Sequence, residues 1–77
     1  MAELPLQGDH ITLAQALKAV GLAGSGGQAK HLVRGGTIEV NGVVETQPGR
    51  KLRAGDRFRA DESTEWVIGN GPPEGAP

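Results

Sequence analysis

The stretch from Ser25 to Gly42, S-G-G-Q-A-K-H-L-V-R-G-G-T-I-E-V-N-G, constrains the fold of this chain more than any other. It predicts a helix that begins after Ser25, because a serine followed three residues later by glutamine forms a capping box. The pair Gly35-Gly36 predicts the helix end, where a left-handed residue is needed that glycine adopts at little cost. Residues 37–40 then alternate like a strand, and Asn41-Gly42 predicts a tight hairpin.

The 3.6-residue period divides this predicted helix into an apolar and a polar face. The apolar face consists of Ala29, Leu32 and Val33. The polar face consists of Gly27, Lys30, His31 and Arg34. We therefore expect one face to pack against the rest of the domain and the other to carry its charge into solvent.

A first helix is predicted from Thr12, which forms a second capping box with Gln15. Apolar residues follow at helical spacing up to Val20, and Gly21 ends the helix. Residues 22–24 are a short connection, which predicts that the two helices lie side by side.

The rest of the chain predicts short strands at residues 43–45, 57–59 and 66–68, separated by turn residues. The expected fold is α+β, with two short N-terminal helices packed on a small twisted sheet of three to four mainly antiparallel strands. The predicted core is Leu13, Leu17, Val20, Leu32, Val33, Ile38, Val40, Leu52, Phe58 and Val67. Trp66 is expected to pack rather than to stack on a base.

We divide the chain into an N-terminal extension (1–10), a single domain (11–68) and a disordered tail (69–77), since the tail is rich in glycine and proline. Leu4-Pro5-Leu6 fits either a sheet edge, where proline is tolerated, or a loose terminus, and the sequence leaves both open.

Charge is distributed unevenly, which the net charge of -1 conceals. Residues 10–59 hold all eight Lys and Arg against three acidic residues, a net charge of +5. This asymmetry indicates an anionic partner. The 77 residues include no cysteine, no signal-peptide pattern and no membrane-spanning apolar run, so a reducing, cytoplasmic setting is expected.

Several chemistries have little support. Residues 24–29 match G-x-G-x-x-A, but a helix rather than a strand precedes them, which argues against a dinucleotide site. No carboxylate pair or nucleophile-base arrangement is recognisable in the sequence. His31 has no second histidine one helical turn later, because position 35 is glycine, so the two-histidine metal site of a helix is excluded. We therefore expect neither an enzyme nor a metal or cofactor. Gly26 and Gly27 permit either a phosphate at the helix N-terminus or close packing against the first helix, and both interpretations stay open.

The two capped helices, the G-G-T-I-E-V-N-G turn and the later G-R-K-L-R-A-G-D resemble, over about residues 11–59, the RNA-binding domain named for ribosomal small-subunit protein four. The resemblance is strongest to small stand-alone bacterial members, and Gly26 stands where many members have arginine. It implies an αα turn followed by a small sheet, and binding of structured RNA, ribosomal or transfer RNA, through the second helix and nearby basic residues.

The resulting hypothesis is a non-enzymatic, monomeric module that grips the phosphate backbone of structured RNA. Its candidate contacts are Lys18, Ser25, Gly26, Gly27, Gln28, Lys30, His31, Arg34, Arg50, Lys51 and Arg53. The alternative is a protein-interaction adaptor that docks its basic face on an acidic partner, such as a ribosome-associated protein. A nucleotide binder at residues 24–27 is the weakest of the three.

Overall fold

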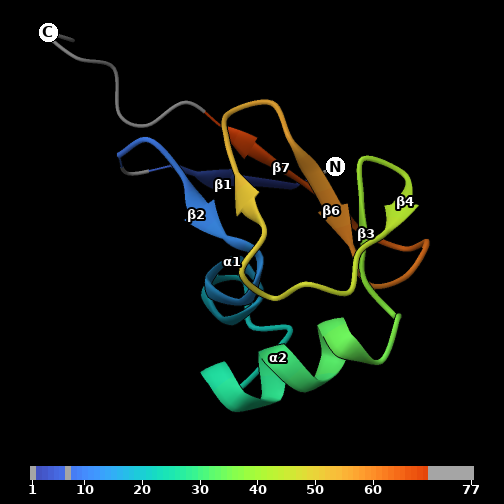
Figure 1. Ribbon diagram of the computed structural model, residues 1–77. Coiled ribbons are helices and arrows are strands. Elements are labelled where there is room, and N and C mark those ends of the chain that lie inside the picture. Colours follow the sequence, from blue (N-terminus) through green and yellow to red (C-terminus); the bar gives the residue numbers. More distant parts are fainter. Residues whose placement is uncertain (1, 7, 70–77) are drawn as a thin grey trace, which may run out of the picture.

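The computed structural model describes residues 2–6 and 8–69 and confirms the α+β class (Figure 1). The helices are α1 (Leu13–Ala19) and α2 (Gly26–Arg34). The strands are β1 (Ala2–Pro5), β2 (Ile11–Thr12), β3 (Glu39–Val40), β4 (Val43–Val44), β5 (Lys51–Leu52), β6 (Arg57–Arg59) and β7 (Glu65–Gly69). The two helices lie together at one end of the molecule, with the larger sheet beyond them.

The strands form more extensive sheets than predicted. The larger sheet has five strands in the order β1-β7-β6-β3-β4, and β2 and β5 form a separate antiparallel pair. β1 runs parallel to β7, while the other neighbours in the larger sheet are antiparallel. The prediction that three to four strands follow two N-terminal helices is therefore wrong. Two strands, β1 and β2, precede α1, and five strands, β3 to β7, follow α2 in the described residues. Of the two possibilities for Leu4-Pro5-Leu6, the structure shows the sheet edge, with Pro5 opposite Gly69.

The first helix begins as predicted and is anchored by a distant loop. Thr12 and Gln15 form a complete capping box, with Gln15 N–H to Thr12 Oγ1 at 3.2 Å and Thr12 N–H to Gln15 Oε1 at 3.0 Å. The next two N–H groups, of Leu13 and Ala14, donate to the carbonyls of Arg50 and Pro48. The loop before β5 thus completes the cap of α1. Gly21, at φ +82°, follows the helix end.

The second helix begins at the predicted position, but its cap differs in one bond. Ser25 Oγ accepts from Gln28 N–H at 3.1 Å, as expected. The Gln28 side chain reaches past Ser25 and accepts from Gly24 N–H at 2.6 Å, so the reciprocal bond predicted to the cap residue is wrong. At the other end Gly36 takes the left-handed conformation at φ +81°.

The hairpin at Asn41-Gly42 is confirmed. Both residues have positive φ, 53° and 83°, the combination that a two-residue type I′ turn requires, and they join β3 to β4. A polar turn leads into β7, in which Asp61 Oδ1 accepts from the N–H groups of Ser63 and Thr64.

One apolar core joins the helices to the sheets. Its buried members are Leu6, Leu13, Ala16, Leu17, Ala23, Ala29, Val33, Ile38, Val40, Leu52, Phe58 and Ile68. Val20, Leu32 and Val67, expected in the core, are only partly buried.

The register of β7 explains the error at Val67. Trp66 lies opposite Phe58 and Val67 opposite Arg57, so Val67 shares the outward face of Arg57, while Trp66 and Ile68 point toward the core. Trp66 packs against the core, as predicted. Gly69 is buried within β7 and accepts from Leu6 N–H at 3.1 Å, so it does not belong to the predicted tail. Residues 70–77 of that tail lie outside the described residues.

Candidate nucleic-acid interface

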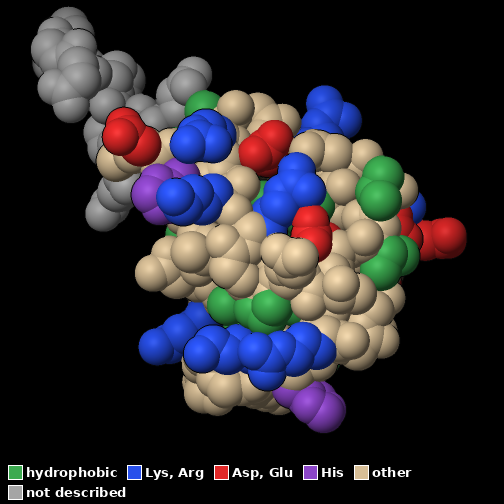
Figure 2. Space-filling model, in the orientation of Figure 1, with side chains coloured by type: hydrophobic (Ala, Val, Ile, Leu, Met, Phe, Trp, Pro, Cys, Tyr) green, Lys and Arg blue, Asp and Glu red, His purple; other side chains and the backbone are tan. Residues whose placement is uncertain are grey.

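The outward face of α2 carries the cations that the helical period predicted. Lys30, His31 and Arg34 are exposed, while Ala29 and Val33 on the opposite face are buried. The basic residue of α1, Lys18, is also exposed. Figure 2 shows Lys and Arg side chains gathered in a band over the two helices. Among the described residues, none of Lys18, Lys30 and Arg34 takes part in an ion pair.

The N-terminus of α2 is bare around two backbone N–H groups. Ser25 satisfies the N–H of Gln28, and no side chain of residues 2–6 or 8–69 accepts from Gly26 or Gly27. A methyl group placed at Gly26 would meet no atom within 4 Å, and one at Gly27 only Ser25 Oγ at 4.0 Å. The interpretation that these glycines allow close packing against α1 is therefore wrong. They leave two N–H groups accessible at the positive end of the helix dipole.

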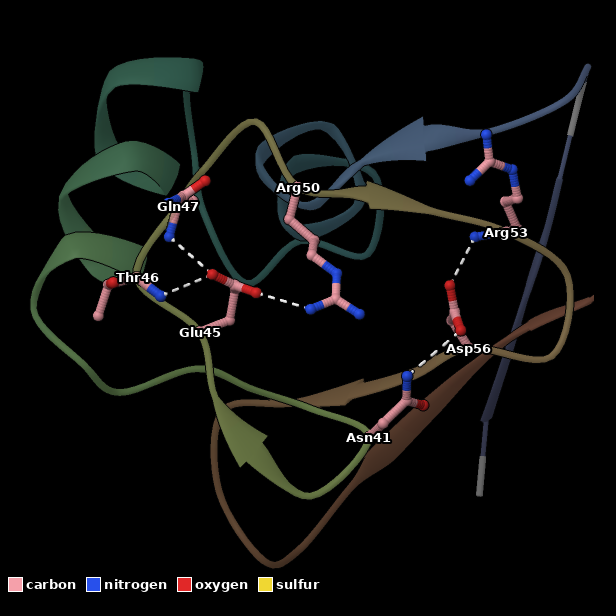
Figure 3. Close-up of polar contacts among 7 residues, drawn as sticks. All are labelled: Asn41, Glu45, Thr46, Gln47, Arg50, Arg53 and Asp56. Carbon is pink, nitrogen blue, oxygen red and sulfur yellow. Dashed lines mark hydrogen bonds and ion pairs between the residues drawn. The ribbon is translucent and has the colours of Figure 1, made fainter.

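Arg50 differs from the other basic candidate contacts, because its side chain forms an ion pair within the protein (Figure 3). Its Nη1 donates to Glu45 Oε1 at 2.8 Å. The other carboxylate oxygen of Glu45 accepts from the N–H groups of Thr46 and Gln47, each at 3.1 Å. The bond from Arg50, followed by that from Gln47 N–H, lowers the pKa of Glu45 below its usual value. The charge of Arg50 is thus offset locally, and its side chain stabilises the loop that caps α1.

Lys51 lies in β5, and Arg53 follows directly after this strand. Lys51 pairs with Thr12 across the β2–β5 ribbon, so this segment is one half of an antiparallel pair. Both side chains are exposed, and neither forms an ion pair in the part of the chain that the structure describes.

A small polar network holds the turn after β5. Asp56 Oδ2 accepts from Arg53 N–H at 2.8 Å, and its Oδ1 accepts from Asn41 Nδ2 at 3.2 Å (Figure 3). Asn41 Oδ1 in turn accepts from Arg57 N–H at 3.0 Å. The sequence does not predict the contact between Asn41 and Asp56, because nothing local indicates that positions fifteen residues apart will bond.

The remaining arginines belong to the outward face of the larger sheet. Arg59 donates to Glu39 on the neighbouring strand, with Nη2 to Oε1 at 3.0 Å, and this carboxylate raises the pKa of Arg59. Arg57 Nη1 lies 4.0 Å from Glu65 Oε1. Five cations remain without an ion-pair partner among the described residues, namely Lys18, Lys30, Arg34, Lys51 and Arg53.

Other kinds of site were also sought within residues 2–6 and 8–69. No group of three or more His, Cys, Asp or Glu side chains there is arranged to hold a metal ion. The helices in this part of the chain are too short and too polar to cross a membrane.

The fold and the site together define a class of protein, a small α+β domain with an exposed basic face on its second helix. The comparison with protein families is more specific: the model described as the S4 domain matches residues 4–68. The chain belongs to the S4 domain family. Domains of this family are generally RNA-binding and non-enzymatic, which supports a role in RNA binding. No match was found among curated proteins.

Proposed function

We propose that this protein binds the phosphate backbone of structured RNA, with α2 as the main contact. One observation carries the proposal: Lys30 and Arg34 on α2 and Lys18 on α1 are exposed without ion-pair partners in the described chain, and α2 begins with the bare N–H groups of Gly26 and Gly27. Cations and helix N-terminal N–H groups are the donors that phosphates accept from. Ser25, Gln28 and His31 are also exposed, as are Lys51 and Arg53, and we include all five among the RNA contacts, with Arg50 contributing through the loop it stabilises.

The scarcity of aromatic residues favours folded RNA over a splayed single strand. The chain has one Phe and one Trp; Phe58 is buried and Trp66 packs against the core, so neither offers a stacking platform. Backbone contacts without base stacking read the shape of a folded RNA. We accordingly propose ribosomal or transfer RNA as the partner, bound in the cytoplasm of a bacterium by a monomeric protein.

An amide-shift NMR titration tests this proposal directly. The probes are a ribosomal RNA stem-loop and a single strand of equal length, each at two salt concentrations. Shifts are expected at residues 25–34 and 50–53, larger with the stem-loop and weaker at higher salt. An absence of shifts with both RNAs at low salt would defeat the proposal.

A second candidate function is the adaptor that docks on an acidic protein. It is favoured by Val43 and Val44, which are 69% and 53% exposed on an edge strand. Exposed apolar side chains beside charged ones are common where proteins associate. A pull-down that survives nuclease treatment and is lost in Val43→Thr/Val44→Thr would support this function over RNA binding.

A further inference from the structure

The Asn41-Gly42 turn takes no part in the proposed RNA contacts, but its two residues can react with each other. The side-chain amide of an asparagine is open to attack by the backbone nitrogen of the next residue, and a glycine there has no side chain to hinder the approach. Both residues are exposed, and a methyl group placed at Gly42 would meet no atom within 4 Å. The space that this reaction needs is therefore free.

The side chain of Asn41 is held in another direction, toward Asp56 (Figure 3). Its Nδ2 donates to Asp56 Oδ1 at 3.2 Å, and its Oδ1 accepts from Arg57 N–H at 3.0 Å. The backbone N–H of Asn41 donates to the carbonyl of Arg57 at 2.8 Å, which fixes the residue beside β6. For the reaction, the side-chain carbonyl carbon has to turn onto the nitrogen of Gly42. Both side-chain bonds must open first.

We infer that Asn41 is a deamidation site that the fold protects, and that its conversion to an acid separates the β3–β4 hairpin from the turn after β5. In the first step the nitrogen of Gly42 bonds to Cγ of Asn41 and the Cγ–Nδ2 bond breaks. The amide nitrogen leaves as ammonia, with the proton from Gly42 N–H. Water then opens the resulting succinimide ring at either of its carbonyl carbons, which leaves aspartate or isoaspartate at position 41.

Either product removes a contact that the turn depends on. In the aspartate product a carboxylate replaces the amide that donated to Asp56, so two negative groups face each other and repel. Because Asp56 also accepts from Arg53 N–H at 2.8 Å, displacing its carboxylate loosens the turn after β5 as well. In the isoaspartate product the main chain is longer by a methylene group, and the paired φ angles of 53° and 83° no longer describe a type I′ turn.

The protection is tested by comparing reaction rates in the folded and unfolded chain. The sequence has two asparagines, so Asn70→Gln leaves Asn41 as the sole site. The protein is incubated in mildly alkaline buffer with and without denaturing urea, and mass-spectrometric peptide mapping separates the amide, aspartate and isoaspartate forms. The rate in the folded protein should be about ten- to hundredfold lower, because two hydrogen bonds must open. Equal rates would overturn the inference.

The role of Asp56 is tested in the same background. Asp56→Ala removes one of the two side-chain bonds and should raise the rate in the folded protein about three- to tenfold. The matched control is Asp61→Ala, which removes a carboxylate bonded to the N–H groups of Ser63 and Thr64 and should leave the rate unchanged. Equal rates in the two folded variants would overturn the protecting role of Asp56. Circular dichroism verifies that each variant is folded.

The consequence of the reaction is tested without waiting for it. Asn41→Asp reproduces one product and should lower the equilibrium constant for folding about tenfold, measured by urea unfolding. Adding Asp56→Asn returns an amide to the pair with donor and acceptor exchanged, so stability should recover to near that of the wild type. If the double variant is no more stable than Asn41→Asp, repulsion between the two carboxylates does not separate the hairpin from the turn, and this part of the inference fails.

Discussion

Removing two cations from α2 should change the salt dependence of RNA binding in a way that total charge cannot explain. Five cations have no ion-pair partner among the described residues. If each meets one phosphate, the slope of log affinity against log salt is about −3.5 to −4.5, since each neutralised phosphate contributes about 0.7 to 0.9. In Lys30→Gln/Arg34→Gln the slope should become less steep by about 1.4 to 1.8.

The difference is large enough to measure by fluorescence anisotropy with a labelled stem-loop. Between about 50 and 200 mM salt, affinity should fall about 100- to 500-fold for the wild type and about 20- to 40-fold for the variant. Circular dichroism should show an unchanged fold, because both side chains are exposed.

The matched control is Arg57→Gln/Arg59→Gln, which removes the same charge from arginines that face Glu65 and Glu39. Its slope should stay within about 0.5 of the wild-type value. Equal reductions in the two double variants would refute the reasoning, because they would show that RNA responds to net charge rather than to the face of α2.

Three further predictions concern single positions. Glu45→Gln should lower the free energy of unfolding at about pH 7 by about 1 to 2 kcal/mol, because it weakens the bonds from Arg50, Thr46 and Gln47. Because folding lowers the pKa of Glu45 from 4.5, this stabilisation is present above pH 4.5 and is lost as pH falls through the pKa of the folded protein. Urea titrations at several pH values should therefore show the free energies of unfolding of wild type and variant converging in acid. A difference that stays constant with pH would contradict the assignment. Gly26→Arg should raise RNA affinity several-fold, because the site has room for the side chain and the arginine adds a cation to α2. The thermal midpoint should change little, because the gain in helix propensity is opposed by repulsion between the arginine and the positive end of the helix dipole. Weaker RNA binding would show that the bare N–H groups need a glycine. Asn41→Ala should lower the free energy of unfolding by about 1 to 3 kcal/mol, because it loses the hydrogen bonds to Asp56 and Arg57 and places alanine at a positive φ. Asn41→Gly should lose only the hydrogen bonds. Chemical denaturation that finds the glycine variant less stable than the alanine variant would argue against this account.

Local signals in the sequence predicted the parts of the fold that depend on a few neighbouring residues. Thr12 and Ser25 begin the two helices, Gly21 and Gly36 take the left-handed positions after them, and Asn41-Gly42 makes the hairpin. Each depends on hydrogen bonds or dihedral angles within about one turn of chain. The 3.6-residue helical period likewise correctly predicted that Lys30 and Arg34 lie on an exposed face of α2.

Pairing between distant segments was decided only by the tertiary structure. β1 joined the sheet beside β7, β2 paired with β5, and the register of β7 sent Val67 outward and Ile68 inward. That Gly26 and Gly27 do not serve close packing against α1 was also clear only from the empty space around them.

The division of the cations into paired and unpaired groups has the same origin. Glu45 and Arg50 are close in sequence, but Arg59 pairs with Glu39, which lies twenty residues away, only because their two strands align. Composition and periodicity show how many charges a chain has and on which side of a helix they lie. Which charges are neutralised within the protein, and which are left for a partner, depends on the distances between them, and those are set by packing.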